Sequence, residues 1–294
     1  MKNGLFIFRR DFRITDNIGF LEAYKQVEKL YTCFIFTPEQ VSNKNDFKSK
    51  NSIQFMIESL KELETKIKEK QGRLLLFYGK NEKVINSLIT ELELDGVFFN
   101  RDYTPYALNR DEEIKTLCQK RNVVCETFQD YYLFEPGTIL TGSSQMFKKY
   151  TPFYNATKSY KFPSVKSGNV RKLGTNKLTD ITLDDAMKKF VGDINEDILV
   201  HGGRELGLKQ LQLAKVSQKQ YGETRDFFDK NTSHLSAYIK FGCVSIREVY
   251  KEFSHIEAFV SELIWREFFA HVLYAYPEVV GKSYQKKYRK LEWN

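Results

Sequence analysis

Three hydroxyl side chains gather within five residues in the second half of the chain. The run reads Thr232-Ser233-His234-Leu235-Ser236, and helical periodicity covers 234–241. Hydroxyls at the start of a helix, with its unpaired backbone N–H groups and the positive end of its dipole, suit a phosphate or pyrophosphate. Such residues also serve as an ordinary helix N-cap. The run is therefore a candidate anion site, with simple capping as the alternative.

A second unusual group recurs at helical spacing further along the chain. Glu262, Trp265, Arg266 and Phe269 are three or four positions apart, so a helix would present them on one face. A face with a carboxylate, an indole and a guanidinium is uncommon in a core. It suits a pocket in which a flat group is stacked and hydrogen-bonded. The alternative is a packing helix with incidental charges.

A third charged cluster follows the first apolar run of the chain. Arg9-Arg10-Asp11-Phe12-Arg13 come directly after residues 5–8, and Asp16-Asn17 follow. No nucleophile or metal-ligand set is nearby, so we expect a charge network that joins loops at the edge of a sheet. The turn has no glycine-rich phosphate cradle, and the chain has no P-loop sequence. A conventional NAD site and phosphoryl transfer are therefore not expected.

The elements that would position these residues can be predicted from periodicity. Five short apolar runs occupy 5–8, 31–36, 74–78, 97–100 and 123–128, and helix-period segments occupy 18–29, 52–70, 82–93 and 107–121. Buried strands that alternate with helices predict a parallel, doubly wound α/β sheet of five strands. Such a sheet binds its ligand beyond the carboxyl ends of the strands.

The second half of the chain differs in composition. Residues 136–179 contain no acid and eight basic side chains, and helix periodicity without a convincing strand covers 203–220, 234–241, 245–254 and 256–275. We therefore predict three parts. They are an α/β domain at 1–135, a basic, mostly irregular linker at 136–200, and an incomplete all-α domain at 201–294.

Composition restricts the classes of function. The chain has 294 residues, with 46 Lys and Arg against 38 Asp and Glu, and a formal net charge of +8. This basic excess and a tyrosine-interleaved basic cluster at 282–290 make nucleic acid a plausible partner, although solvated basic loops have the same composition. No apolar run approaches a membrane span, and no metal site is expected. We expect a soluble, intracellular protein.

Taken together, these stretches resemble the photolyase/cryptochrome family of blue-light flavoproteins, which includes the DNA photolyases. The matching segments begin with FRRDFRITDN and continue at 100–111, 123–156, 232–250 and 262–277, in the order of the family. The resemblance implies an α/β antenna domain followed by the first helices of an FAD-binding domain.

The resemblance also implies roles for the cofactor candidates. Tyr221 and the run at 232–236 would hold the pyrophosphate of FAD, and Phe259 stands where a Trp often lies against the flavin. Ala107 takes the place of a Glu that folate-binding members use. A folate antenna is therefore not expected, and the identity of any antenna chromophore is open.

For DNA, the resemblance implies contacts with UV-damaged strands. Glu262 and Trp265 would be catalytic and would touch a damaged pyrimidine pair flipped out of the duplex. Arg225 would reach the DNA backbone, and Arg266 and Phe269 would complete the surface. The implied enzyme is a deoxyribodipyrimidine photo-lyase, in which light-excited reduced flavin donates an electron that splits the dimer.

The chain departs from the family at its end. It stops at Asn294, where the flavin domain of the family is only about half built, and Trp293 would be the outermost residue of an electron-transfer chain. We therefore expect a truncated form or one half of a split enzyme, which a second polypeptide completes. The alternatives are a cryptochrome-like flavoprotein without repair activity and a non-catalytic remnant that binds DNA by charge. Glu262 beside Trp265 favours repair.

Overall fold

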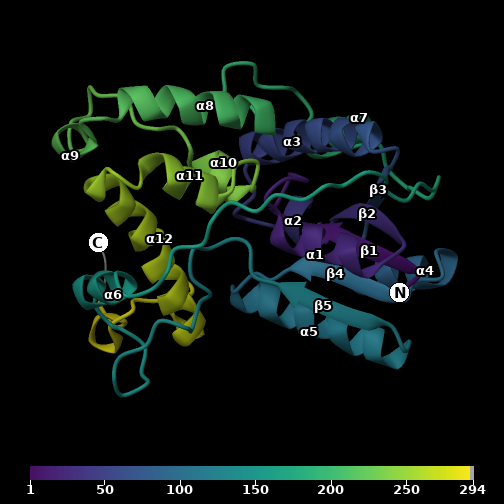
Figure 1. Cartoon of the computed structure of the whole chain (residues 1–294), viewed down its shortest axis with the longest axis horizontal. Helices are drawn as coiled ribbons and strands as arrows, with labels where there is room; N and C mark the ends of the chain where they lie inside the picture. Colours follow the sequence, from purple (N-terminus) through teal and green to yellow (C-terminus); the bar gives the residue numbers. More distant parts are fainter. Residues whose placement is uncertain (292–294) are drawn as a thin grey trace.

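The computed structural model describes residues 1–291 and contains one parallel sheet with a group of helices beside it (Figure 1). The strands are β1 (Asn3–Phe8), β2 (Lys29–Phe36), β3 (Leu74–Tyr78), β4 (Gly96–Asn100) and β5 (Val124–Phe128). All pairings are parallel, in the order β3-β2-β1-β4-β5. These are the five predicted strands, and the doubly wound α/β class is confirmed.

Helices cover both faces of the sheet and bury its side chains. On one face Phe6 and Phe8 pack with helices α1 (Ile18–Gln26) and α3 (Lys50–Glu69). On the other face Leu5 and Ile7 pack with α4 (Asn81–Glu91) and α5 (Pro105–Lys120). Because both faces of the central strands β1, β2 and β4 are buried, these strands are nearly continuous apolar runs, whereas the edge strand β5 is partly exposed and contains Glu126.

Capping residues fix the loops that leave the strands. The Asn17 side chain accepts a hydrogen bond from the N–H of Phe20 at the start of α1. Thr104 does the same for Ala107 at the start of α5, where Pro105 occupies the first helical position. Such caps satisfy backbone donors that have no partner within the helix. They hold the first turns of α1 and α5 near the carboxyl edge of the sheet.

The remaining regular elements of the described chain are helices. The further elements are α2 (Pro38–Val41), α6 (Tyr150–Thr157), α7 (Leu183–Phe190), α8 (Arg204–Ser217), α9 (Tyr221–Thr224), α10 (Ser236–Lys240), α11 (Ile246–Phe253), α12 (Glu257–Ala275) and the 3-10 turns η1 (Pro277–Val279) and η2 (Lys286–Tyr288). Four of these helices, α8, α10, α11 and α12, match the predicted segments. Periodicity did not indicate α2, α6, α7 or α9. Within 1–291 no helix is long and apolar enough to cross a membrane.

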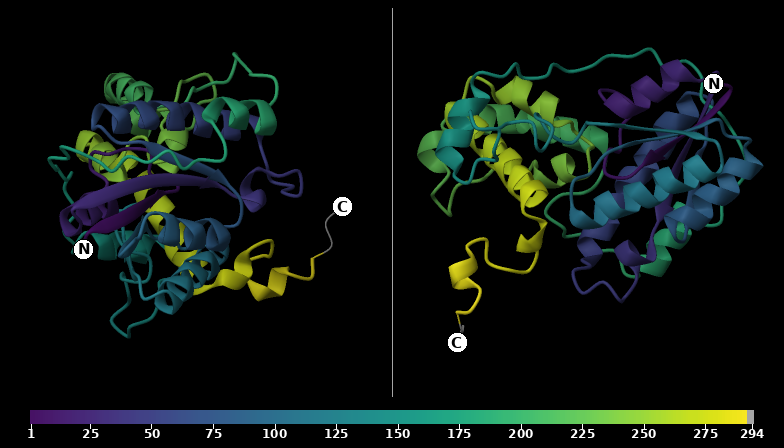
Figure 2. Two further views of the ribbon diagram at one scale, coloured as in Figure 1. Left: turned by 90° about the vertical axis from the view of Figure 1, so that its right-hand side faces the viewer. Right: turned by 90° about the horizontal axis from the view of Figure 1, so that it is seen from below.

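The connecting segment, residues 158–182, runs back over the α/β part (Figures 1 and 2). Along its course the N–H of Gly174 donates to the carbonyl of Leu30 at 2.7 Å, and that of Asp180 donates to Leu76 at 3.0 Å. Its side chains Val170 and Leu173 are buried in the same core as α1 and α3. This stretch, expected to be a linker, therefore covers part of the sheet domain.

A buried network of ion pairs joins the α/β part to α11. We call Arg13, Asp16, Asp130 and Arg247 the junction network. Asp130 pairs with Arg13 at 2.6 Å and with Arg247 at 2.7 Å, and Arg247 pairs with Asp16 at 3.0 Å. Burial would raise the pKa of Asp130, but the two arginines outweigh it and lower that pKa. The expected charge network is thus present, and it extends to Arg247, which the sequence did not indicate.

The turn between α10 and α11 lies directly on the loop after β1. Gly242 has a φ of +64°, and a Cβ there would lie 2.4 Å from the carbonyl oxygen of Arg10. The N–H of Phe12 donates to the carbonyl of Phe241 at 3.1 Å, and Arg13 donates to the carbonyl of Gly242 at 2.9 Å. Only glycine fits this close approach. The two halves of the chain are therefore in backbone contact near the sheet edge.

Candidate functional site

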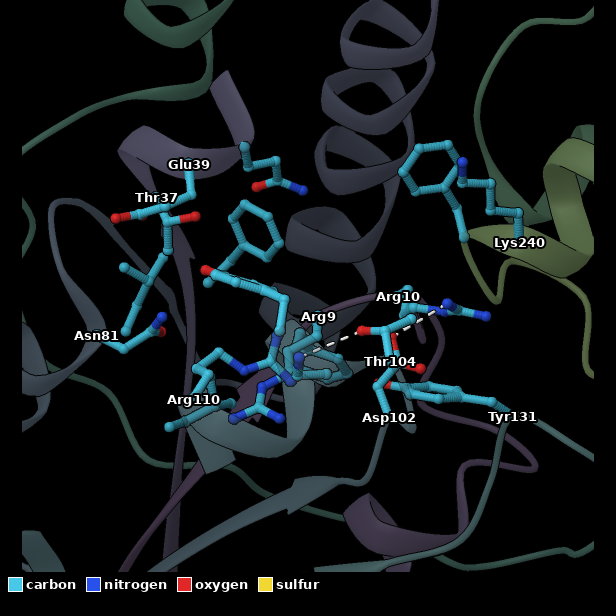
Figure 3. A pocket seen from close by; sticks show the side chains of 18 residues that line it. Arg9, Arg10, Thr37, Glu39, Asn81, Asp102, Thr104, Arg110, Tyr131 and Lys240 are labelled. Atoms are coloured by element: carbon cyan, nitrogen blue, oxygen red, sulfur yellow. Dashed lines mark hydrogen bonds and ion pairs between the residues drawn. The ribbon is translucent and has the colours of Figure 1, made fainter. Parts of the chain in front are cut away.

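A cavity of about 330 Å³ opens at the carboxyl ends of the strands. Arg9 follows β1, Thr37 follows β2, Asn81 follows β3 and Asp102 follows β4, and all four line it. Thr37 and Asn81 lie on one side of the cavity, Lys240 lies on the other, and Arg9 lies between them (Figure 3). This is the edge at which a doubly wound sheet binds its ligand, and the volume falls in the range of small-molecule sites.

The cationic side chains of this cavity are incompletely paired. Arg9 and Arg110 share a single oxygen of Asp111, at 2.6 and 2.9 Å, and Arg10 pairs with Asp102 at 3.1 Å. Buried nitrogens of all three arginines, Nη2 of Arg9, Nε of Arg10 and Nη2 of Arg110, have no hydrogen-bond partner within the described chain. Burial and the neighbouring charge of Arg110 lower the pKa of Arg9.

Two other elements complete the cavity wall. Ala107 lies in the first turn of α5, lines the cavity and is 1% exposed. Ala107, which takes the place of a Glu that folate-binding members of the resembled family use, therefore borders this cavity. Lys240 and Phe241 come from the end of α10, so the helical part contributes to a site built mainly by the sheet.

The hydroxyl-rich run forms a loop that leads into α10. Its hydroxyls, on Thr232, Ser233 and Ser236, make no hydrogen bond with any described residue, and none of them caps α10. His234 takes the left-handed conformation, with φ of +51°. Leu235 is 1% exposed and packs in the core. The capping alternative is therefore not realised, and Leu235 anchors a loop whose hydroxyls are available to a ligand.

Helices α9 and α12 bring four of the predicted residues together. The edge of the Tyr221 ring meets Phe259, with ring centroids 5.0 Å apart, and Phe259 stacks on Phe253 at 3.8 Å. Arg225, directly after α9, pairs with Glu262 of α12 at 2.8 Å, and both side chains are about two-fifths exposed. The DNA-backbone and lesion candidates thus already contact each other.

Trp265 lies within an aromatic stack. Its indole is 3.6 Å from the ring of Tyr150 in α6, with 7° between the planes, and 5.5 Å from that of Phe269. The hydroxyl of Tyr150 donates to the carbonyl of Ser261 at 2.8 Å and holds this arrangement. Phe269 is 61% exposed. One face of the indole is occupied within the chain, so a flat ligand must use the other face or displace Tyr150.

Arg266 is directed toward the α/β part. It donates to the carbonyl of Tyr131 at 2.7 Å, pairs with Glu267 at 3.0 Å and lies 4.5 Å over the ring of Tyr132. Glu267 in turn accepts from the N–H of Phe134 at 3.0 Å. These contacts tie α12 to the loop after β5. They give Arg266 a structural role and argue against the DNA contact expected for it.

The basic cluster at 282–290 lies in the segment after α12, which extends away from the body of the molecule (Figure 2). The rings of Tyr276 and Tyr284 meet edge to face, with centroids 5.6 Å apart. Arg289 donates to the carbonyl of Ser283 at 2.9 Å. Trp293, the expected outer electron-transfer residue, lies outside the described residues.

Comparison with known proteins identifies the family. The sequence model of the family described as DNA photolyase matches residues 5–168, more than half of the chain. This chain belongs to the DNA photolyase family. Among solved structures, an archaeal photolyase from Sulfolobus tokodaii with two FAD molecules is 31% identical over 99% of this chain and 64% of its own, with a TM-score of 0.86.

Curated photolyase relatives align with nearly the whole of this chain. Deoxyribodipyrimidine photo-lyases of Synechococcus and Alkalihalophilus pseudofirmus are 26% and 28% identical, each over 98% of this chain. The chain spans 64% and 62% of their lengths. A cryptochrome from Synechocystis, 20% identical over 94% of this chain and 62% of its own with a TM-score of 0.81, shares the fold.

Sequence reasoning singled out Arg9, Arg10 and Ala107 of this photolyase-family chain, but it did not identify the other polar residues that line the cavity with them. Thr37, Asn81 and Asp102 each follow a predicted strand, so the rule that ligands bind at strand ends could have singled them out. Arg110 and Lys240 carry no such signal. Arg110 lies within a helix, and Lys240 comes from a distant part of the chain.

Proposed function

We propose that this chain forms the antenna part, and a portion of the flavin and lesion site, of a photolyase that repairs pyrimidine dimers in UV-damaged DNA with light. Residues 1–135 would be the antenna domain, 136–200 the connection and 201–294 the first part of the FAD-binding domain. The observation that carries the proposal is family membership combined with the Arg225–Glu262 pair beside Trp265 on α12.

The residues fit a flavin phosphate. The hydroxyls of Thr232, Ser233 and Ser236 are without partners in the described chain, and Tyr221 is only half-buried beside Phe259. Hydroxyl donors on a loop fixed by a core leucine would bind a pyrophosphate with little loss of conformational freedom. Bound FAD would supply light-driven electron transfer. The chain would supply binding, orientation and a wall that excludes water.

The residues on α12 fit a lesion. The Glu262 carboxylate can accept hydrogen bonds from the N–H groups of a pyrimidine pair, and the indole of Trp265 offers a surface for stacking. Because Arg225 and Glu262 are both partly exposed, their pair can open when DNA binds. Arg225 would then turn to a backbone phosphate.

We further propose that sequence corresponding to the remaining third of the relatives completes the flavin site, on a second polypeptide or in continuity with this one. The relatives' greater length supports this. The cavity at the sheet edge would hold the antenna chromophore, since it has the size of a ligand site and lies at the expected edge.

The first test is flavin retention. The chain is co-expressed with the carboxyl-terminal third of a photolyase relative, passed through gel filtration and examined for flavin absorbance, and the complex is then assayed for repair of irradiated DNA under blue light and in the dark. Retained flavin with light-dependent repair supports the proposal. Retained flavin without repair supports the cryptochrome-like alternative, and no flavin contradicts the proposed site.

The second test concerns the lesion. Trp265→Ala should reduce the preference for UV-damaged over undamaged DNA several-fold in a binding titration, because stacking recognises the lesion whereas basic side chains bind phosphate. Phe228→Ala is the matched control, since that ring is fully exposed and makes no ring contact in the described chain. Equal weakening on both DNAs would argue against lesion stacking by Trp265.

A further inference from the structure

We propose that α8 packs antiparallel against α8 of a second copy of this chain, so that two copies form a symmetric dimer through this helix. The position of α8 allows such a contact, because the helix lies at the outside of the helical part (Figure 1). An exposed apolar stripe and the order of the charges beside it support a second copy as the partner. Repair of DNA neither requires this dimer nor excludes it.

The inner face of α8 is taken up by the fold. Gly207, Leu211 and Ala214 are buried on this face. A Cβ at Gly207 would lie 2.8 Å from side-chain atoms of Tyr238 and Val244, so the helix is seated closely against α10 and the turn after it. This packing holds the opposite face of α8 toward solvent.

The outer face of α8 carries apolar side chains in a row. Leu206, Leu213 and Val216 are 44%, 55% and 67% exposed, and the exposed Lys209 lies between the first two. Their spacing of three, four and three residues is that with which one helix packs along another in a coiled coil. We call these four residues the outer stripe.

The neighbouring helix α3 shows that such a stripe is not general for the surface helices of this chain. The large apolar side chains of α3, from Ile53 to Ile67, are all buried. Its exposed positions include Lys61, Thr65 and Glu69, which are polar. A helix that is apolar on its outward face as well as its inward face is typical of one that is covered on both sides. The outer stripe therefore indicates a partner.

The charges beside the stripe identify a second copy as this partner. Glu205, Gln212 and Lys219 are exposed and lie seven residues apart, so they follow one flank of the stripe. This flank is acidic at the start of α8 and basic two residues past its end. In a parallel pair of copies the like charges would meet, whereas in an antiparallel pair each Glu205 meets a Lys219.

The apolar and the charged contacts require the same register. When Leu206 of one copy is set against Val216 of the other, the geometry of an antiparallel pair also sets Glu205 opposite Lys219. The Glu205 side chain is 72% exposed although it pairs with Lys66 at 3.1 Å, so it can reach a second cation. One patch then serves both copies, as a two-fold dimer requires.

At the centre of the contact, Lys209 meets Leu213 of the other copy. The methylene stem of a lysine can cover an apolar side chain while its ammonium group stays in water. A lysine at such a position specifies the orientation of the helices and lowers the stability of the pair. The stripe is also short, about 15 Å along the helix axis, so the interface lies at the small end of specific protein contacts. We therefore expect a dimer that dissociates on dilution.

The first experiment measures the oligomeric state of the purified chain. Sedimentation velocity is recorded over a dilution series from about 500 µM to about 1 µM, which covers the range of a weak protein contact. The average mass should approach that of two chains at the highest concentration and that of one chain at the lowest. A chain that sediments as a monomer throughout the series overturns the proposal.

A charge within the stripe should break the dimer without harming the fold. Leu213→Glu should raise the dissociation constant about tenfold or more, because the contact would bury a carboxylate without a partner. Its thermal unfolding, followed by circular dichroism, should match that of the wild type, since Leu213 is already exposed. Leu108→Glu is the matched control, because Leu108 is a leucine of similar exposure on α5. Equal weakening of the dimer by the two variants contradicts the proposal.

A charge swap tests the antiparallel register. Lys219→Glu should weaken the dimer several-fold, because two carboxylates then meet at each end. The double variant Glu205→Lys with Lys219→Glu should restore it, since the exchanged charges attract each other again. The contact with Lys66 that the double variant loses is partly exposed and contributes little. A double variant that dimerises no better than Lys219→Glu contradicts this register.

The other occupant to exclude is the fragment proposed to complete the flavin site. The carboxyl-terminal third of a photolyase relative is co-expressed with the wild-type chain and with Leu213→Glu, and both products are analysed by sedimentation. A fragment that binds both chains equally and leaves the wild-type dimer intact supports the proposal. A fragment that dissociates the wild-type dimer and fails to bind Leu213→Glu assigns the stripe to the fragment and overturns the proposal.

Discussion

Two of the arginine–carboxylate systems in the molecule differ strongly in burial and in the number of contacts that each makes. The junction network consists of Arg13, Asp16, Asp130 and Arg247, and each of these side chains is 1% exposed. The Arg225–Glu262 pair on the outer side of α12 is about two-fifths exposed. The carboxylates of the junction network each accept several hydrogen bonds. Within the described chain the Glu262 carboxylate accepts one, from Arg225, and this contact is accessible to water.

This difference indicates which contacts hold the fold and which are free for function. A buried ion pair that loses one member leaves a charge without a partner in low dielectric, so it resists exchange. A half-exposed pair gains little and can exchange its partner for another charged group at small cost. By this criterion the junction network fixes the two parts of the chain, and the pair on α12 is free to exchange partners, as the proposed contact with DNA requires.

The largest effect should come from breaking the junction network. Arg247→Met should lower the free energy of unfolding by about 3–5 kcal/mol, because Asp16 and Asp130 lose a buried partner. Urea denaturation followed by circular dichroism measures the change. Arg225→Met, at the exposed pair, is the control and should cost no more than about 1 kcal/mol. Similar losses in the two variants would abolish the distinction drawn above.

A smaller effect should come from the Arg266–Glu267 pair, in which Glu267 is fully buried while Arg266 is about a quarter exposed. Burial raises the pKa of Glu267 from 4.5 to about 7 despite Arg266 and the N–H groups of Phe134 and Leu133. The folded chain therefore keeps a proton that the unfolded chain releases between those pH values. Stability from this group is greatest below pH 4.5 and is lost as the pH rises to about 7, a change of up to about 3 kcal/mol.

Glu267→Gln tests this pH dependence, because the amide cannot ionise. The free energy of unfolding, measured by urea denaturation at several pH values between 4.5 and 7.5, should fall less steeply in the variant than in the wild type. The raised pKa of Asp11, about 6 through burial, contributes a slope of the same sign to both proteins. Parallel slopes would mean that Glu267 titrates at its ordinary value.

The smallest effect concerns the aromatic stack on α12. A double-mutant cycle of Tyr150→Ala and Trp265→Ala should give a coupling free energy of about 1 kcal/mol, as expected for stacked rings at this separation. Unfolding free energies of the two single variants and the double variant measure it. Zero coupling would indicate that the stack of Tyr150 on the indole contributes nothing to stability, so that Tyr150 could be displaced by a ligand at little cost.

The strands and the longer helices could be predicted from their local periodicity, whereas several of the short helices could not. All five strands were predicted, the central ones because burial on both faces makes nearly continuous apolar runs. Helix α7 was missed although its capping box, Thr182 with Asp185, is legible in the sequence. The four residues of α2 are too few to show a period.

The candidate sites could be predicted only where their residues are close together in the sequence. The turn after β1 indicated a charge network, but the partner Arg247 lies more than 200 residues from Asp16, and only the fold brings it there. Tyr150, which covers Trp265, comes from a stretch that polarity marked as irregular connection. The open hydroxyls of the run at 232–236 and the cavity at the sheet edge became visible once neighbouring side chains were in place.

The course of the connecting segment decides where this chain can be divided. A product ending at residue 135 would lose the backbone bonds to Leu30 and Leu76 and would leave the space filled by Val170 and Leu173 to water. A fragment that keeps the sheet together with this cover, for recombinant work or for swapping between homologues, therefore extends through α7 to about residue 191. A crossover placed earlier would separate the sheet from part of its own cover.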